Sequence, residues 1–165
     1  MLRPATDADL DLIREWRNQD ANRTSSNYSH VISPAEHAAW WARTTNDPTR
    51  RILIFVHEGT PCGVANFFDL DESDRSGSWG FFLDSEGAYG KDLGAWISLM
   101  REGVAYAFAD LRLRTLRGEV LEGNPSVRAM NRRLGFVEAP PEEREVDGRR
   151  FTVYPLRMTA DTRRG

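Results

Sequence analysis

Cysteine and lysine are almost missing from this chain of 165 residues: Cys62 is the only cysteine, and Lys91 is the only lysine among 22 basic residues. A single cysteine excludes an intramolecular disulfide. We expect a cytoplasmic protein, because neither a signal-peptide pattern nor an apolar run of membrane length occurs. The three histidines, His30, His37 and His57, lack the four-residue spacing of helical metal ligands, so no metal is expected.

Charge and composition narrow the class of protein further. A net charge of −3 argues against nucleic acid as the main partner but leaves small anionic ligands open. With 40% hydrophobic and 28% charged residues, the chain has an ordinary globular composition. No repeat or long linker divides it, so we expect a single domain over residues 1–165.

The hydrophobic periodicity and turn signals predict an α/β (α+β) protein with a mixed sheet and about four helices. Thr6 and Ser33 are predicted helix caps, the second followed by proline and by Glu36 in a capping box. A third helix is expected over 91–110, and a fourth between Asn124 and Gly135. The expected strands cover 1–5, 52–57, 62–70, 77–83, 114–121, 136–146 and 151–158.

The segment Tyr89-Gly90-Lys91-Asp92-Leu93-Gly94-Ala95 follows a predicted strand and opens the long helix. A glycine-rich turn at a helix start presents unpaired backbone N–H groups and the positive end of the helix dipole. The segment therefore predicts a phosphate-binding loop, with Tyr89, Gly90, Lys91, Leu93, Gly94 and Ala95 as cofactor-binding residues.

A second segment strengthens this interpretation. Asn124-Pro125-Ser126, followed by Arg133-Leu134-Gly135-Phe136, together with the loop upstream, resembles the acetyl-CoA site of the Gcn5-related N-acetyltransferase (GNAT) superfamily. The order of predicted elements is similar to the GNAT fold over nearly the whole chain. The resemblance implies acetyl-CoA as cosubstrate, held between strands 77–83 and 114–121, which splay apart, with Asn124 as a further contact.

Two positions depart from the loop frame of the family, which is Arg or Gln, two variable residues, Gly, one variable residue, then Gly or Ala. Tyr89 replaces the basic or amide residue, and Asp92 replaces the first glycine. A carboxylate beside a pyrophosphate repels it, so Asp92 is expected to weaken binding unless Lys91 offsets the charge.

The resemblance implies direct transfer, in which a neutral amine attacks the thioester carbonyl and the CoA thiolate leaves. Backbone N–H groups near Phe82 and Leu83 would stabilise the oxyanion. Asn131 stands where many relatives place a tyrosine acid; its amide can donate a hydrogen bond to the thiolate but cannot deliver a proton. The candidate routes for the proton of the amine are His30, Glu122 and Ser78.

The N-terminal half resembles a branch of the superfamily that acetylates a nucleotide-linked amino sugar in pseudaminic acid synthesis. The similarity lies in Trp16-Arg17-Asn18, in the segment from Tyr28 to Ser33 and in Glu36-His37. It implies that the first two helices and their connecting loop wall the pocket of a small-molecule amine. The predicted substrate-binding residues are Trp16, Arg17, Asn18, Tyr28 and His30.

Two other interpretations are kept. The departures at Tyr89, Asp92 and Asn131 are compatible with a GNAT-fold module that binds CoA or another ligand without catalysis. An active enzyme could instead acetylate a protein N-terminus or an antibiotic. The oligomeric state is left open, with a homodimer as one option.

Overall fold

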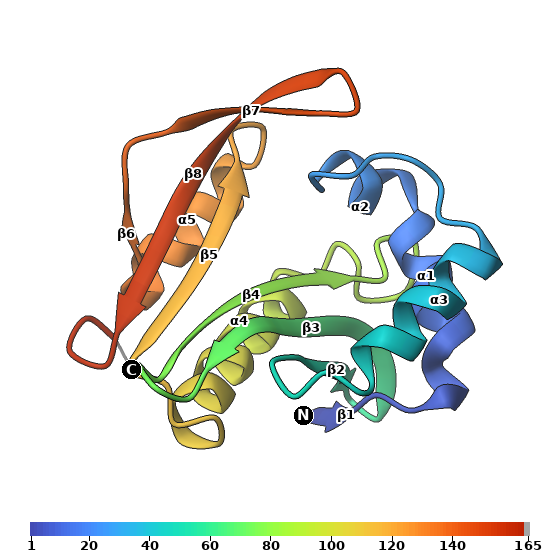
Figure 1. Ribbon diagram of the computed structural model, residues 1–165, viewed down its shortest axis with the longest axis horizontal. Helices are drawn as coiled ribbons and strands as arrows, with labels where there is room; N and C mark the ends of the chain where they lie inside the picture. Colours follow the sequence, from blue (N-terminus) through green and yellow to red (C-terminus); the bar gives the residue numbers. More distant parts are fainter. Residues whose placement is uncertain (164–165) are drawn as a thin grey trace.

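The computed structural model describes residues 1–163, which form one sheet with helices on both faces (Figure 1). The strands are β1 (Leu2–Pro4), β2 (Arg51–His57), β3 (Thr60–Asp71), β4 (Ser76–Leu83), β5 (Thr115–Leu121), β6 (Val137–Glu138), β7 (Glu142–Val146) and β8 (Arg149–Thr159). The helices are the 3-10 turn η1 (Asp7–Asp9), α1 (Leu10–Asn18), α2 (Asp20–Thr24), α3 (Pro34–Thr44), α4 (Leu93–Ala109) and α5 (Pro125–Leu134).

The strand order is β1-β2-β3-β4-β5-β8-β6, with β7 paired to β8. All pairs are antiparallel except β4 with β5, which is parallel. The predicted mixed, mostly antiparallel sheet is therefore confirmed. The described residues hold five α-helices rather than about four, because Asp20–Thr24 forms a short helix inside a polar stretch that lacks apolar periodicity.

The local signals at the helix ends behave largely as predicted. The hydroxyl of Ser33 accepts a hydrogen bond from the N–H of Glu36 at 3.1 Å. The Glu36 carboxylate does not close the capping box and instead contacts Nε2 of His30 at 2.8 Å. Gly135 ends α5 in the left-handed region with φ 104°, where glycine carries no steric cost.

Helices cover both faces of the sheet, which explains the continuous apolar sequence of β2. Leu53 and Phe55 pack on the face covered by α4, whereas Ile52 and Ile54 pack with α1 and α3 on the other. Alternate residues of this strand thus enter two separate cores.

Trp79 fills the space beneath the point where β4 and β5 separate. Its ring stacks on Phe136 with centroids 6.2 Å apart, and a Cβ added at Gly103 of α4 would lie 2.3 Å from its Cζ3 atom. Gly118 of β5 is similarly close, with its added Cβ 3.3 Å from the indole Nε1. The indole therefore requires small residues on both neighbouring elements and fixes the base of the opening.

Candidate active site

The sheet opens between its two parallel strands. β4 and β5 pair only from Ser76 to Ser78 and from Thr115 to Arg117, and beyond this point they diverge (Figure 1). Ser78 lies opposite Arg117 in the last paired position, so this proposed catalytic residue is at the closed end of the opening. The splay expected between strands 77–83 and 114–121 is present.

The register of β4 decides which backbone groups face the opening. The N–H of Asp84 donates to the carbonyl of Cys62 on β3 at 2.8 Å, and antiparallel ladder bonds recur at every second residue. The backbone groups of Phe82 therefore point to β3, while those of Phe81 and Leu83 point into the opening. The prediction for Leu83 is retained, and Phe81 replaces Phe82 as the second N–H donor.

Asp92 is the N-cap of α4. Its Oδ1 accepts hydrogen bonds from the N–H of Gly94 at 2.7 Å and from that of Ala95 at 3.4 Å. The carboxylate thus satisfies amide groups that were predicted to bind phosphate. Lys91 and Leu93, also predicted cofactor contacts, are exposed beside it, and 62% of Leu93 is accessible.

Close contacts shape the loop that leads to α4. A Cβ at Gly90 would lie 2.4 Å from the carbonyl oxygen of Asp84, so only glycine fits there without movement. Nε1 of Trp96 donates to the Gly90 carbonyl at 3.2 Å. The loop therefore folds tightly back on the end of β4.

Tyr89 ties the same loop to the β2–β3 turn. Its hydroxyl donates to Oε2 of Glu58 at 3.0 Å, and this hydrogen bond raises the pKa of Tyr89. The ring lies edge-on to His57, with centroids 4.9 Å apart. Tyr89 thus orders the loop, and its hydroxyl is engaged by protein rather than directed at a ligand.

Across the opening, α5 carries Asn124 and Asn131. Asn124 occupies the N-cap position of α5, and its side chain makes no capping hydrogen bond. Asn131 is 1% exposed, and within residues 1–163 its Oδ1 atom has no hydrogen-bond partner. A buried, unpaired amide oxygen is costly, which makes Asn131 a strong candidate for a ligand contact.

Two residues of the predicted acceptor wall have other tasks. Trp16 is 2% exposed and packs with Ile13, Trp41 and the sheet, so it belongs to the core. Asn18 donates from Nδ2 to the carbonyl of Ile32 at 2.9 Å and accepts from the N–H of Ile32 at 2.8 Å. Both the nitrogen and the oxygen of its amide bind the backbone of the α2–α3 loop, so we remove both residues from the proposed wall.

The remaining three wall residues lie on or beside that loop. Nη2 of Arg17 donates to the carbonyl of Tyr28 at 2.8 Å, and burial, with a smaller effect of Arg23, lowers the pKa of Arg17. Tyr28 is 56% exposed and available for contact. His30 is paired with Glu36, whose pKa this hydrogen bond lowers, so its imidazole is held at the start of α3.

A depression of about 550 Å³ lies beside the opening. It brings Glu122 and Asn124 together with residues absent from the sequence prediction: Thr24, Ser25, Leu121, Gly123, Glu143, Arg149, Arg150, Phe151 and Thr152. Nη2 of Arg149 donates to the carbonyl of Ser26 at 3.0 Å and so joins the β7–β8 hairpin to the end of α2. Asp147 and Gly148, which separate the expected strands 136–146 and 151–158, form the turn of this hairpin with positive φ, but sequence does not give the direction in which the hairpin points.

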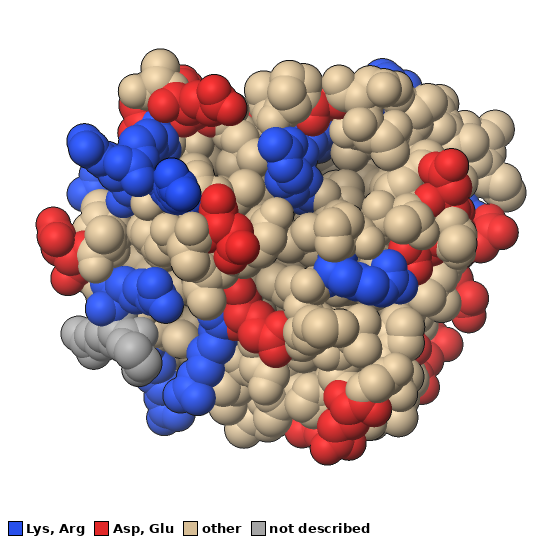
Figure 2. Space-filling model, turned by 90° about the horizontal axis from the view of Figure 1, so that it is seen from below, with Lys and Arg blue, Asp and Glu red and all other residues tan. Residues whose placement is uncertain are grey.

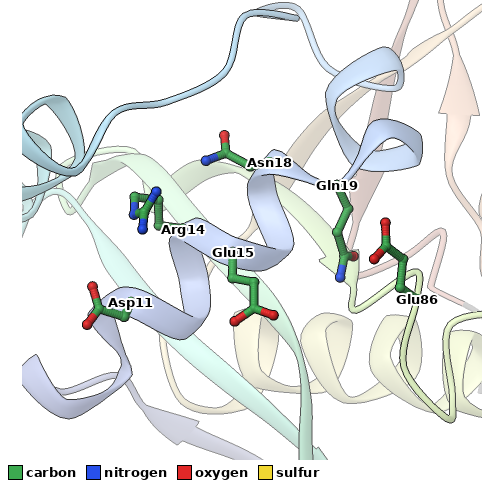
Figure 3. A pocket seen from close by; sticks show the side chains of 6 residues that line it. All are labelled: Asp11, Arg14, Glu15, Asn18, Gln19 and Glu86. Atoms are coloured by element: carbon green, nitrogen blue, oxygen red, sulfur yellow. The ribbon is translucent and has the colours of Figure 1, made fainter.

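Another depression, of about 670 Å³, lies along the outer side of α1. Its lining is polar and comprises Asp11, Arg14, Glu15, Asn18, Gln19 and Glu86 (Figure 3). It contains none of the proposed catalytic residues, so we do not place the reaction there.

Basic and acidic side chains are interspersed on the face shown in Figure 2, with more of the basic ones toward the side of α5 and β8. Across residues 1–163 no helix is long and apolar enough to cross a membrane. The same residues contain no group of three or more His, Cys, Asp or Glu side chains placed to hold a metal ion.

A sheet that splits between two parallel strands, with one helix following each of them, has the architecture expected for an acyl-CoA-dependent acyltransferase. A family model described as the acetyltransferase (GNAT) domain matches residues 1–137. The chain belongs to this family.

Individual relatives agree with the assignment. A Bacillus subtilis (strain 168) protein named as a proposed ribosomal N-acetyltransferase, YdaF, is 30% identical over 98 residues. The match covers 59% of this chain and about half, 52%, of that protein.

Solved structures show the same fold. The spermidine N-acetyltransferase of Vibrio cholerae in complex with CoA and spermine superposes with a TM-score of 0.83 at 18% identity, over 98% of this chain and 96% of that one. A chimera of the Vibrio cholerae enzyme with hSSAT gives the same score and identity over 96% and 94% of the two chains. At this identity the likeness concerns the fold.

Proposed function

We propose that this protein transfers an acetyl group from acetyl-CoA to the primary amine of a small molecule, and that residues 1–165 act as one domain. The observation that carries the proposal is the opening between β4 and β5, into which the backbone groups of Phe81 and Leu83 point. Membership of the GNAT domain family supports acetyl-CoA as the donor.

The residues around the opening fit that donor. The backbone groups of Phe81 and the N–H of Leu83 have no partner on β3, so the amide groups of pantetheine can add to them as an extra strand, whereas the Leu83 carbonyl already accepts from Nδ2 of Asn22. The N-terminus of α4, together with the loop from Gly90 that precedes it, favours negative charge, and Asn131 supplies a buried amide with an unpaired oxygen. When bound, acetyl-CoA supplies an activated acetyl group.

The chain itself contributes charge stabilisation and a route for one proton. The N–H groups of Phe81 and Leu83 stabilise negative charge that develops on the carbonyl oxygen. Nδ2 of Asn131 donates a hydrogen bond to the departing sulfur, whose ordinary thiol pKa makes a strong acid unnecessary.

Among the three proposed bases, we favour Glu122. Its carboxylate lines the depression at the mouth of the opening, whereas His30 is paired with Glu36 and Ser78 lies at the closed end. Glu122 can accept the proton of the incoming amine directly or through water.

The acceptor pocket is the depression between α2 and the β7–β8 hairpin. Glu122 and Glu143 in its wall favour a cationic amine, and Arg149 and Arg150 offer donors to an anionic group elsewhere on the same molecule. An amino sugar carried on a nucleotide has both features, and Arg17, Tyr28 and His30 remain its proposed contacts. The fold neighbours named for spermidine make polyamines the first comparison.

The donor half of the proposal is tested by titrating CoA into the protein in a calorimeter and by thermal unfolding. A ligand at 100 times its dissociation constant stabilises the native state by about 2.7 kcal/mol. Absence of both heat and stabilisation at millimolar CoA would refute the donor assignment.

The acceptor half is tested by release of free CoA thiol from acetyl-CoA with a panel of polyamines, amino sugars, nucleotide-linked amino sugars, aminoglycosides and N-terminal peptides. Glu122→Gln should lower kcat/KM more at low than at high pH, because amine deprotonation no longer needs the carboxylate when the free amine predominates. CoA binding without turnover of any amine would instead favour the ligand-binding module.

A further inference from the structure

Two buried amide side chains join the acceptor-side helices to the donor-side loop. Gln19 and Asn22 lie at the junction of α1 and α2 and are only 9% and 7% exposed. Such groups are retained in protein interiors when they satisfy specific partners. Their partners lie more than sixty positions away in sequence, at the end of β4.

Asn22 holds the last residue of β4. Its Nδ2 donates to the carbonyl of Leu83 at 2.8 Å and to the carbonyl of Trp16 at 2.8 Å. The Leu83 carbonyl has no β3 partner because it points away from that strand, and Asn22 supplies the missing donor. The hydrogen bond fixes the residue whose N–H faces the opening.

Gln19 holds the first turn after β4. Its Nε2 donates to Oδ1 of Asp84 at 2.6 Å, and its Oε1 accepts from the N–H and Oγ of Ser85 at 2.7 and 2.8 Å. The same Asp84 oxygen accepts from the N–H of Gly87 at 3.0 Å. Figure 3 shows the Gln19 side chain extending from the end of α1 toward the loop that carries Glu86.

We propose that Gln19 and Asn22 are positioning residues for the donor site, which together set the end of β4 and the loop from Asp84 to Gly90. The inference rests on the proposed function, because it assigns the purpose of this loop to CoA binding. Because Gly90 packs against the Asp84 carbonyl, fixing the position of Asp84 also fixes the position of Gly90 and of the start of α4. Neither residue needs to touch the ligand.

Gln19→Met tests the proposal, since it keeps side-chain length and removes all three of these hydrogen bonds. We expect the Ser85 and Gly87 amides to exchange hydrogen about tenfold faster or more, and the Kd for CoA to rise by a similar factor. Asp9→Asn is the matched control, because it weakens a buried contact with Arg3 near the β1 edge of the sheet. It should lower the melting temperature without changing either measurement.

Gln19→Glu separates positioning from simple loss of packing. Its carboxylate still accepts from Ser85 but faces the Asp84 carboxylate, so CoA affinity at neutral pH should fall as in Gln19→Met. Near pH 5, about one unit above ordinary carboxyl pKa values, a proton shared by the pair should restore part of that affinity. Asp9→Asn has no such pair, so its CoA affinity should stay equal to that of the wild type at both pH values.

The outcomes are distinct. Unchanged exchange at Ser85 and Gly87 with unchanged CoA affinity in Gln19→Met would overturn the proposal, as would an equal loss of affinity in Asp9→Asn. If the wild-type protein fails to bind CoA, the proposed function falls and the donor-site role falls with it. Faster exchange in Gln19→Met would then still show that these amides order the loop.

Discussion

Replacing Asp92 by glycine should tighten the binding of CoA. In the ligand-free protein the Asp92 carboxylate accepts from the N–H groups of Gly94 and Ala95, which a phosphate would otherwise use. Binding in the wild type must therefore displace a helix cap worth about 1 kcal/mol. It must also bring phosphate charge near a carboxylate, at a cost of about 1 kcal/mol for unit charges 4 Å apart in water.

The two costs together amount to about 2 kcal/mol, so Asp92→Gly should lower the Kd for CoA by about tenfold to thirtyfold. The stability of the free protein should fall by the contribution of the lost cap, at most about 1 kcal/mol, because glycine is itself an acceptable N-cap. Asp92→Asn is the informative companion, since its amide oxygen can keep the cap while its charge is lost. Asp92→Asn should therefore show about half of the increase in CoA affinity, in kcal/mol, that is expected of Asp92→Gly.

Calorimetric titration with CoA at about 50 mM and about 500 mM salt separates the cost of charge repulsion from the cost of displacing the helix cap. The advantage of Asp92→Asn comes from charge and should shrink at high salt, whereas the part of the Asp92→Gly gain that comes from the released amides should persist. Weaker CoA binding by Asp92→Gly at both salt concentrations would refute the reasoning. It would mean that the cap orders the loop more than it competes with the ligand.

Three further changes have defined outcomes. Gly103→Ala should destabilise the protein by about 1–3 kcal/mol in urea unfolding, despite the better helix propensity of alanine, because the new methyl group would lie 2.3 Å from the Trp79 ring. The Arg3 guanidinium holds the pKa of Asp9 at about 2, below its unfolded value. The contact therefore stabilises the fold by about 2 kcal/mol above about pH 4, and the stability difference between wild type and Asp9→Asn should shrink as the pH falls from about 4 and disappear below about 2. Asn131→Leu should leave the free energy of unfolding unchanged or raise it by about 1 kcal/mol, because a buried oxygen without a partner is removed. The kcat for acetyl transfer should fall in the same variant. Equal kcat values for variant and wild type would exclude Asn131 from the reaction.

The sequence predicted the architecture because its signals are local. Apolar alternation, the Ser33 and Gly135 helix ends and the Asp147-Gly148 turn each specify a short segment, and the structure has all of them. The short helix α2 was missed, since four polar residues and one alanine show no amphipathic face. It is held to the end of β4 by hydrogen bonds from Gln19, just before it, and from Asn22 at its centre, rather than by its own periodicity.

Site residues were predicted less well, because their roles depend on distant parts of the chain. Trp16 was placed in the acceptor wall by resemblance, although its three-residue spacing from Ile13 indicates the buried face of α1. The choice between Phe81 and Phe82 depends on the register with Cys62 of β3, which sequence does not give. The hydrogen bonds of Gln19 and Asn22 to the end of β4 have no sequence signature at all.

The departures at Tyr89 and Asp92 look at first like signs of a lost CoA site, but their contacts suggest another interpretation. Tyr89 binds Glu58 of the β2–β3 turn, and Asp92 caps α4, so each orders the loop before any ligand arrives. An ordered loop lowers the entropy cost of binding, while the Asp92 cap adds a competing contact that must be broken. These effects oppose each other, so we infer a site with reduced CoA affinity rather than a lost one. Weak binding of CoA speeds the release of this product, which an acetyltransferase must complete in every cycle. The Asp92 variants, which are expected to bind CoA more tightly, should release it more slowly.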